Sequence, residues 1–67
     1  MKINIFKIKV LMAERRLTNK ALVEVAGLSV AGFAAIMKKG EASPINVGKI
    51  ADALGVPVEE IALPEEG

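Results

Sequence analysis

The sequence contains no cysteine and no histidine. The absence of cysteine excludes disulfides and thiol nucleophiles, and without either residue the usual zinc sites and imidazole acid/base chemistry are missing too. Aromatic residues are almost absent as well, since the 67 residues include two Phe, no Trp and no Tyr. The fold must therefore depend on aliphatic packing, and we expect no metal, no cofactor and no enzymatic activity.

The chain also lacks any long apolar run. No segment approaches the roughly 20 apolar residues that span a bilayer, and the start, MKINIFKIKVLM, has lysines spread through it and no cleavage signal. We expect one domain, residues 1–67, located in the cytoplasm and without membrane contact. A chain of this size buries only about 60% of its unfolded surface, so its stability should be a few kcal/mol.

The net charge of +1 conceals a strong asymmetry. Residues 1–40 carry a net charge of +6, and residues 41–67 carry −5. This division suggests that one end faces a polyanion while the other faces away. Two solvated faces of opposite sign would explain the same pattern.

The start of the chain predicts a helix over about residues 4–16. Apolar residues recur there at helical spacing in two stripes, Ile5, Ile8, Leu11, Met12 and Ile3, Phe6, Val10. An extended strand over residues 2–10 competes, because that segment also alternates and is rich in β-branched residues. If the first stripe faces the core, the second lies outside unless the C-terminal turn covers it.

Two short helices follow, each with a cap and a glycine stop. Thr18 caps the first, which ends at Gly27, and Ser29 caps the second, which ends at Gly40. Their expected inward residues are Leu22, Val25 and Ala26 in the first, and Val30, Phe33, Ile36 and Met37 in the second.

A fourth helix is predicted by Ser43 and Pro44 at its start and by Gly55 at its end. Its apolar stripe is regular: Val47, Ile50, Ala51 and Leu54. A last turn after Pro57 returns Val56, Ile61 and Leu63 to the core, before an acidic tail over residues 64–67. The prediction is an all-α fold, a compact bundle of four to five short helices.

The order of these signals resembles the Cro/cI-like, or XRE-like, helix-turn-helix family. The resemblance rests on LT before the second helix, GLS at the turn, KG after the third helix and KIADALGV in the fourth. It implies a lambda-repressor-like DNA-binding domain with its motif over about residues 18–39, acting as a sequence-specific transcriptional regulator, most simply a repressor. In this family the third helix enters the major groove and dimers read paired half-sites.

The resemblance also implies roles for individual residues. Thr18 and Asn19 match the pair that clamps a phosphate at the start of the second helix. The start of the recognition helix is matched by Ser29, Val30, Ala31 and Gly32. Capping alone would explain Thr18 and Asn19 equally well.

The outward face of the third helix is nearly bare. Stepping 100° per residue from an inward Phe33 turns Ala31, Ala35 and Lys38 outward. Small apolar groups contact the thymine methyl, so this face could sit deep in the groove while Asn19 and three lysines hold phosphates: Lys20, Lys38 and Lys39. A close protein contact and a merely solvated face are the alternatives, and the terminal lysines also suit a helix C-terminus.

The partners that we expect are double-stranded DNA and a second copy of the chain, with no small-molecule substrate. The homodimer would use residues 56–63 and the first helix, although those residues could equally pack within one chain. The rival function is a protein-interaction module on the same fold, antitoxin-like or an accessory subunit, with weak or lost DNA binding. An enzyme is disfavoured, because the adjacent Glu59 and Glu60 are explained by solvation.

Overall fold

Side-chain caps set the start of every α-helix in the computed structural model, which describes residues 1–64. The helices are α1 (Ile5–Glu14), α2 (Asn19–Ala26), α3 (Val30–Lys39) and α4 (Pro44–Leu54), followed by the short 3-10 turn η1 (Val58–Glu60). The side chains of Asn4, Thr18, Ser29 and Ser43 each accept a hydrogen bond from the backbone N–H three residues later. The all-α prediction is confirmed, and the end of the acidic tail, residues 65–67, lies outside the described residues.

Glycines close three of the helices. Gly27, Gly40 and Gly55 follow α2, α3 and α4 with φ between 70° and 75°, the left-handed conformation in which L side chains are strained. The first helix is shorter than the predicted range of about 4–16: it ends at Glu14, and Arg16 has a positive φ of 53°. The chain thus leaves the right-handed helical conformation at Arg16.

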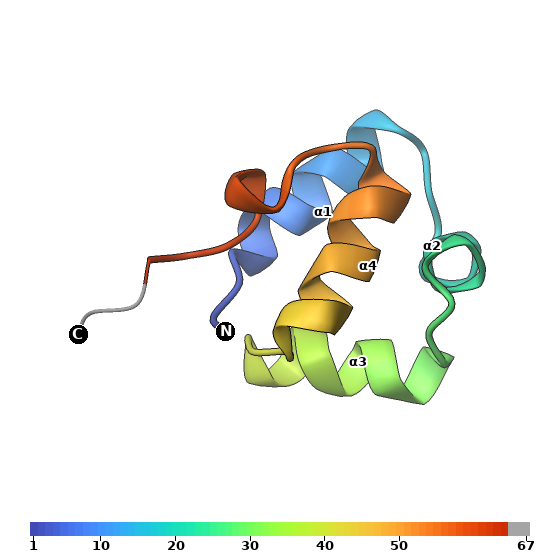
Figure 1. The fold of residues 1–67 in the computed structure, drawn as a ribbon. Coiled ribbons are helices and arrows are strands. Elements are labelled where there is room, and N and C mark those ends of the chain that lie inside the picture. Colours follow the sequence, from blue (N-terminus) through green and yellow to red (C-terminus); the bar gives the residue numbers. More distant parts are fainter. Residues whose placement is uncertain (65–67) are drawn as a thin grey trace.

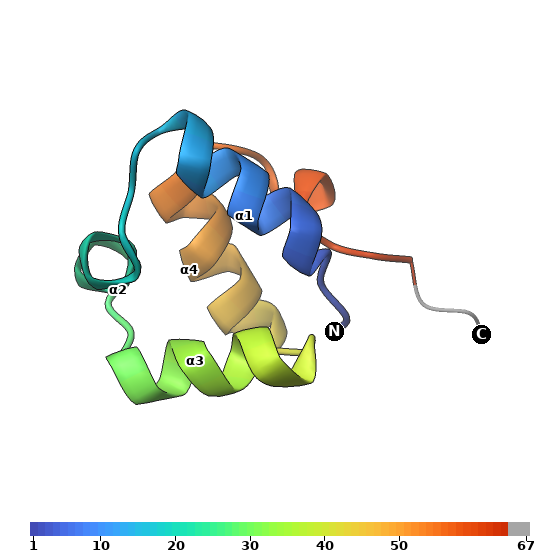
Figure 2. The same ribbon diagram turned by 180° about the vertical axis from the view of Figure 1, so that it is seen from behind.

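The core lies around α4, which is surrounded by the other helices (Figures 1 and 2). The predicted stripe of α4 is buried in full, and it packs with Ile8, Leu11, Met12, Leu22 and Phe33. No polar side chain in the described residues is buried. Aliphatic packing therefore supplies the stability, as the composition indicates.

Two valines contradict the predicted inward faces. In α2 the buried flank is Leu22, Val23 and Ala26, whereas Val25 is 68% exposed. Val23 and Val25 lie on opposite sides of Leu22, and Val23 belongs to the core together with the α4 stripe. Val30 is 58% exposed, because it is the first residue of α3 and no described element covers that end.

The N-terminal segment is extended only at Lys2 and Ile3, so helix rather than strand is the outcome for residues 5–10. Isolated β-bridges pair Lys2 with Glu41 and Ile3 with Ala62. The C-terminal segment therefore covers Ile3, and the start and end of the described chain lie on the same side of the bundle (Figure 1).

The remaining apolar residues at these ends divide between core and surface. Ile61 is fully buried and Val56 packs against the core within the same chain. Leu63 does not return to the core, since it is 40% exposed, and Phe6 in the first turn of α1 is 77% exposed.

Candidate DNA-binding site

The turn between α2 and α3 has helix-turn-helix geometry. Three residues, Gly27 to Ser29, separate the helices, and the helix axes turn by 105° at this break. Figures 1 and 2 show α2 nearly end-on while α3 runs across the view. A turn of three or four residues, often with glycine, between helices at about 90–120° is the geometry of this motif.

The residues that the sequence predicts to hold a phosphate lie at the start of α2. The Thr18 hydroxyl accepts from the Ala21 N–H at 3.1 Å, and the side chains of Asn19 and Lys20 are exposed. The N–H groups of a first helical turn have no acceptor within the helix. An exposed amide and an exposed ammonium group thus lie beside a helix N-terminus, which is a feature of anion sites.

The outward face of α3 is as bare as the sequence predicts. Ala31, Ala34 and Ala35 are all exposed, while Phe33 on the opposite side is buried. The exposed side chain of Val30 extends this small apolar face toward the turn. What α3 offers to a partner is therefore close approach of its backbone and a row of methyl groups.

Gly32 lies at the edge of this face and keeps the cap in place. The Ser29 hydroxyl accepts from the Gly32 N–H at 2.9 Å. A Cβ at Gly32 would lie 2.8 Å from that same hydroxyl oxygen. Any larger residue would therefore push against the Ser29 cap.

Lysines bound the face at its C-terminal end. Lys38 and Lys39 occupy the last turn of α3 and are exposed. They carry no ion pair within residues 1–64, in contrast to Lys7, which pairs with Glu60 at 3.4 Å. Both ammonium groups are thus available to an anion.

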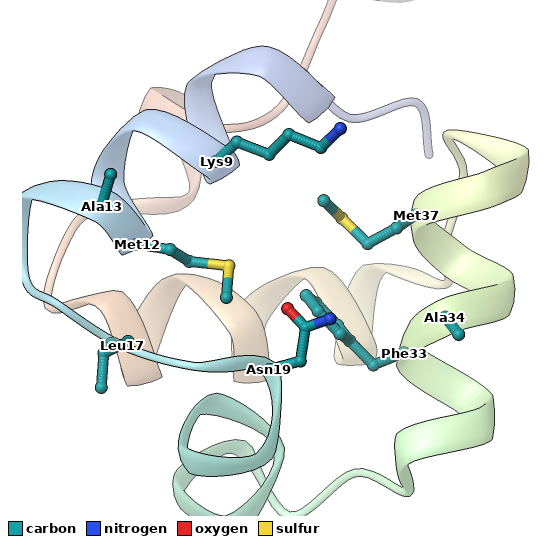
Figure 3. Close-up of a pocket in the computed structure, with 8 residues that line it drawn as sticks. All are labelled: Lys9, Met12, Ala13, Leu17, Asn19, Phe33, Ala34 and Met37. Carbon is teal, nitrogen blue, oxygen red and sulfur yellow. The ribbon is translucent and has the colours of Figure 1, made fainter.

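A groove runs between the two parts of the predicted site, the start of α2 and the helix α3. Its walls come from α1, the start of α2 and α3, and its volume is about 350 Å³. It is lined by Lys9, Met12, Ala13, Leu17, Asn19, Phe33, Ala34 and Met37 (Figure 3). Asn19 and Ala34 therefore line the same groove, Asn19 from the start of α2 and Ala34 from α3.

The contribution of Lys9, Met12 and Met37 to this groove is not apparent from the sequence. Met12 was expected in the core, where it is indeed buried, and Met37 on the inner side of α3, where it is half-buried. The helical spacing of Met12 and Met37 indicates only that each faces the interior of the bundle. Periodicity within one helix does not reveal that α1 and α3 leave a gap between them.

Among residues 1–64 no three His, Cys, Asp or Glu side chains are grouped so that they could hold a metal ion. No single described helix is long and apolar enough to cross a membrane. The bent pair α2 and α3 meets the criterion by length and composition only, as core helices of soluble proteins also do.

Comparison with known proteins identifies the family. A family model described as the Cro/C1-type HTH DNA-binding domain matches residues 7–65. The curated proteins and the solved structures each give no match. The family model covers nearly the whole chain, including both helices of the motif and their glycine stops. The chain therefore belongs to the Cro/C1-type helix-turn-helix DNA-binding domains.

Proposed function

We propose that this protein is a sequence-specific transcriptional repressor that inserts α3 into the major groove of DNA. The observation that carries the proposal is the bare, exposed face of α3, bounded by Ser29 at one end and by Lys38 and Lys39 at the other. Residues 1–67 act as one domain, with the motif over residues 18–39. Its place of action is the cytoplasm, where we expect its DNA target.

The shape of α3 fits this role. The major groove is about 12 Å wide and admits an α-helix. Alanine side chains at positions 31, 34 and 35 let the helix backbone approach the base edges closely. Readout then comes from contacts with thymine methyl groups and from DNA shape, so the discrimination between sequences should be modest.

Phosphate contacts supply most of the affinity. We assign them to Asn19 and Lys20 at the start of α2 and to Lys38 and Lys39 at the end of α3, with Thr18 holding the α2 terminus in place. These groups lie at the two ends of the motif and so can fix the orientation of α3. They carry no sequence information themselves.

A homodimer completes the proposal. Because Val56 and Ile61 pack within their own chain, we narrow the interface to Phe6 and Leu63. Leu63 lies at the paired ends of the chain, where its N–H donates to the Lys2 carbonyl at 3.0 Å, and Phe6 lies in the first turn of α1, which follows the same N-terminal segment. Dimerisation would place two copies of α3 at half-sites about 34–36 Å apart.

A repressor needs no further surface than this. A dimer seated on its operator excludes other proteins from the same DNA.

The rival function, a protein-interaction module, would use the same alanine face together with the exposed Val25 and Val30.

The test has two parts. The protein is titrated with duplex DNA at several salt concentrations, with fluorescence anisotropy as the readout of binding. In addition, the genomic fragments that the protein retains are sequenced. Three lysines per protomer should give a slope of log K against log salt of about −2.7 for a monomer and about −5.4 for a dimer. Replacing Lys38 by Gln should reduce the slope by about one per protomer. Lys49→Gln on α4 is the matched control.

Enrichment of a two-fold symmetric site with a steep salt slope would support the dimeric regulator. Salt-sensitive binding without enrichment would reduce the protein to a nonspecific binder. An absence of binding at low salt would overturn the proposal and favour the rival protein-interaction module.

A further inference from the structure

The groove between α1 and α3 is not used by the proposed DNA contacts, apart from Asn19 and Ala34 on its edge. We propose that it binds a small apolar monocarboxylate, and that the bound acid weakens DNA binding by engaging Asn19. The second half of this inference rests on the proposed function, whereas the first half does not.

The groove walls suit an apolar body. Met12 and Met37 project toward each other from α1 and α3, and Phe33 lies beneath them beside Asn19 (Figure 3). Methionine side chains are flexible and polarisable, and they adapt to ligands of varied shape. A pocket lined by such groups with few polar atoms is typical of small-molecule sites.

The polar groups of the groove specify a single negative charge. Lys9 reaches along one edge of the groove from α1, and the Asn19 amide lies at the opposite edge, at the start of α2, with the side chains of Met12 and Met37 between them (Figure 3). Within the described residues Lys9 makes no ion pair, in contrast to Lys7, which pairs with Glu60. The Asn19 amide can donate to a carboxylate, and the flexible four-carbon stem of the exposed Lys9 lets its ammonium move toward the same carboxylate. A charged hydrogen bond of this kind is among the stronger ones.

The volume limits the ligand to a small one. About 350 Å³ is near the lower end of the range for ligand pockets, about 300–1,000 Å³. The groove is also lined by no acidic side chain, so nothing in it repels an anion. A short fatty acid or an arylalkyl acid combines the required body and charge.

Asn19 links the groove to DNA. The same side chain lines the groove and belongs to the proposed phosphate clamp. A carboxylate that holds the Asn19 amide competes with the phosphate for its donors. By linkage, the acid must weaken DNA binding by the same factor by which DNA weakens binding of the acid.

Methionine methyl NMR tests the site directly, without DNA. The chain has three methionines, of which Met12 and Met37 line the groove and Met1 does not. With methyl-labelled methionine and octanoate as the probe, we expect saturable shifts of Met12 and Met37 with a dissociation constant on the order of 1 mM. Met1 should not shift, and octanol should bind more weakly than octanoate.

Charge reversal at Lys9 sharpens the test. Lys9→Glu should weaken octanoate binding about fivefold to tenfold and should instead favour octylammonium. Lys49→Glu, a matched change at an exposed lysine outside the groove, should leave both ligands unaffected. Because Lys9 is exposed, we expect Lys9→Glu to leave the thermal unfolding transition unchanged. That measurement shows that the variant folds.

Three outcomes would contradict the proposed binding site. They are Met12 and Met37 resonances that do not shift with octanoate, shifts of equal size with octanol, and equal effects of the Lys9 and Lys49 variants on octanoate binding. The regulatory half is tested by adding octanoate to the DNA titration, where we expect a lower affinity for the wild type and a smaller decrease for Lys9→Glu at the same octanoate concentration, each relative to its own ligand-free affinity. Octanoate that binds without changing DNA affinity would overturn the coupling. If the protein binds no DNA at all, the proposed function fails, and the methionine titration still decides the ligand site.

Discussion

At the scale of single residues, the outward side of α3 combines the smallest side chains with the fewest hydrogen-bonding groups. Ala31, Ala34 and Ala35 cannot form the bidentate contacts by which Arg, Asn or Gln identify a base. In the proposed function, close approach of the α3 backbone to the base edges replaces these contacts. The consequence is that any added bulk or negative charge on this face should affect DNA binding far more than it affects folding.

Ala35→Glu tests this consequence. Position 35 is exposed in the middle of α3, so the stability should change by no more than about 0.5 kcal/mol. The new carboxylate would face the DNA backbone charges, and we expect DNA affinity to fall more than about tenfold, the equivalent of 1.4 kcal/mol. Ala35→Gln has nearly the same shape without the charge and should retain more binding. Equal DNA affinity for Ala35→Glu and the wild type would place this face away from DNA.

The two phenylalanines form a natural matched pair. Phe33 is 2% exposed and contacts the core, so Phe33→Ala should cost about 3–5 kcal/mol, enough to unfold a domain of this size. Phe6 is exposed, and Phe6→Ser should change the free energy of unfolding by at most about 0.5 kcal/mol. Urea unfolding measures both.

Sedimentation measures the oligomeric state and should reveal a role of Phe6 in the dimer interface that unfolding experiments do not report. If Phe6 lies in the dimer interface, Phe6→Ser will shift the protein toward monomer at concentrations where the wild type is dimeric. A wild type that remains monomeric at micromolar concentration would remove the dimer from the proposal.

At the scale of elements, each helix is defined by local chemistry at its ends, and glycines inside a helix have distinct roles. Gly48 lies within α4, and a Cβ added there would meet nothing within 4 Å. Gly32 lies within α3 against the Ser29 cap. The same substitution should therefore give different results in the two helices.

Gly48→Ala should stabilise the protein by about 1 kcal/mol, because alanine loses less backbone entropy than glycine on forming a helix. In a domain of this size that gain raises Tm by about 4–8 °C. Gly32→Ala should gain much less, since displacing the Ser29 cap costs about 1 kcal/mol. Thermal unfolding of both variants checks this. An equal gain at both positions would show that Ser29 moves aside without cost.

At the scale of the whole molecule, the first residues connect parts that are distant in the sequence. The Ile3 N–H donates to the Gly40 carbonyl at 3.0 Å and the Asn4 N–H to the Ile61 carbonyl at 2.7 Å. The Ile3 side chain is buried with the core. The N-terminal segment thus holds both the link between α3 and α4 and the C-terminal segment.

Ile3→Ala should therefore cost about 2–5 kcal/mol, the usual loss for a buried isoleucine. Amide exchange should accelerate first at Leu63 and Ala42, whose N–H groups donate to Lys2 and Met1. Lys2→Ala, which removes only an exposed side chain, is the control and should leave both amides protected. Unchanged exchange in Ile3→Ala would show that the two ends are held independently.

Much of the architecture could be predicted because it depends on interactions within a few residues. The caps at Thr18, Ser29 and Ser43 and the stops at Gly27 and Gly40 were predicted at their observed positions. The regular stripe of α4 was also correct, since that helix is central and covered from several sides. The family followed from the order of these same local signals.

The sequence by itself therefore determined the helices, the helix-turn-helix order and the small side chains of α3. Only the tertiary structure decided that Val23 rather than Val25 is buried, that Val30 and Phe6 are exposed, and that α1 and α3 leave a groove containing Lys9 and Asn19. The physical reason is the distance along the chain over which each interaction acts. A cap or a glycine acts on its own helix turn, whereas the burial of one flank and the shape of a groove depend on how distant helices pack together.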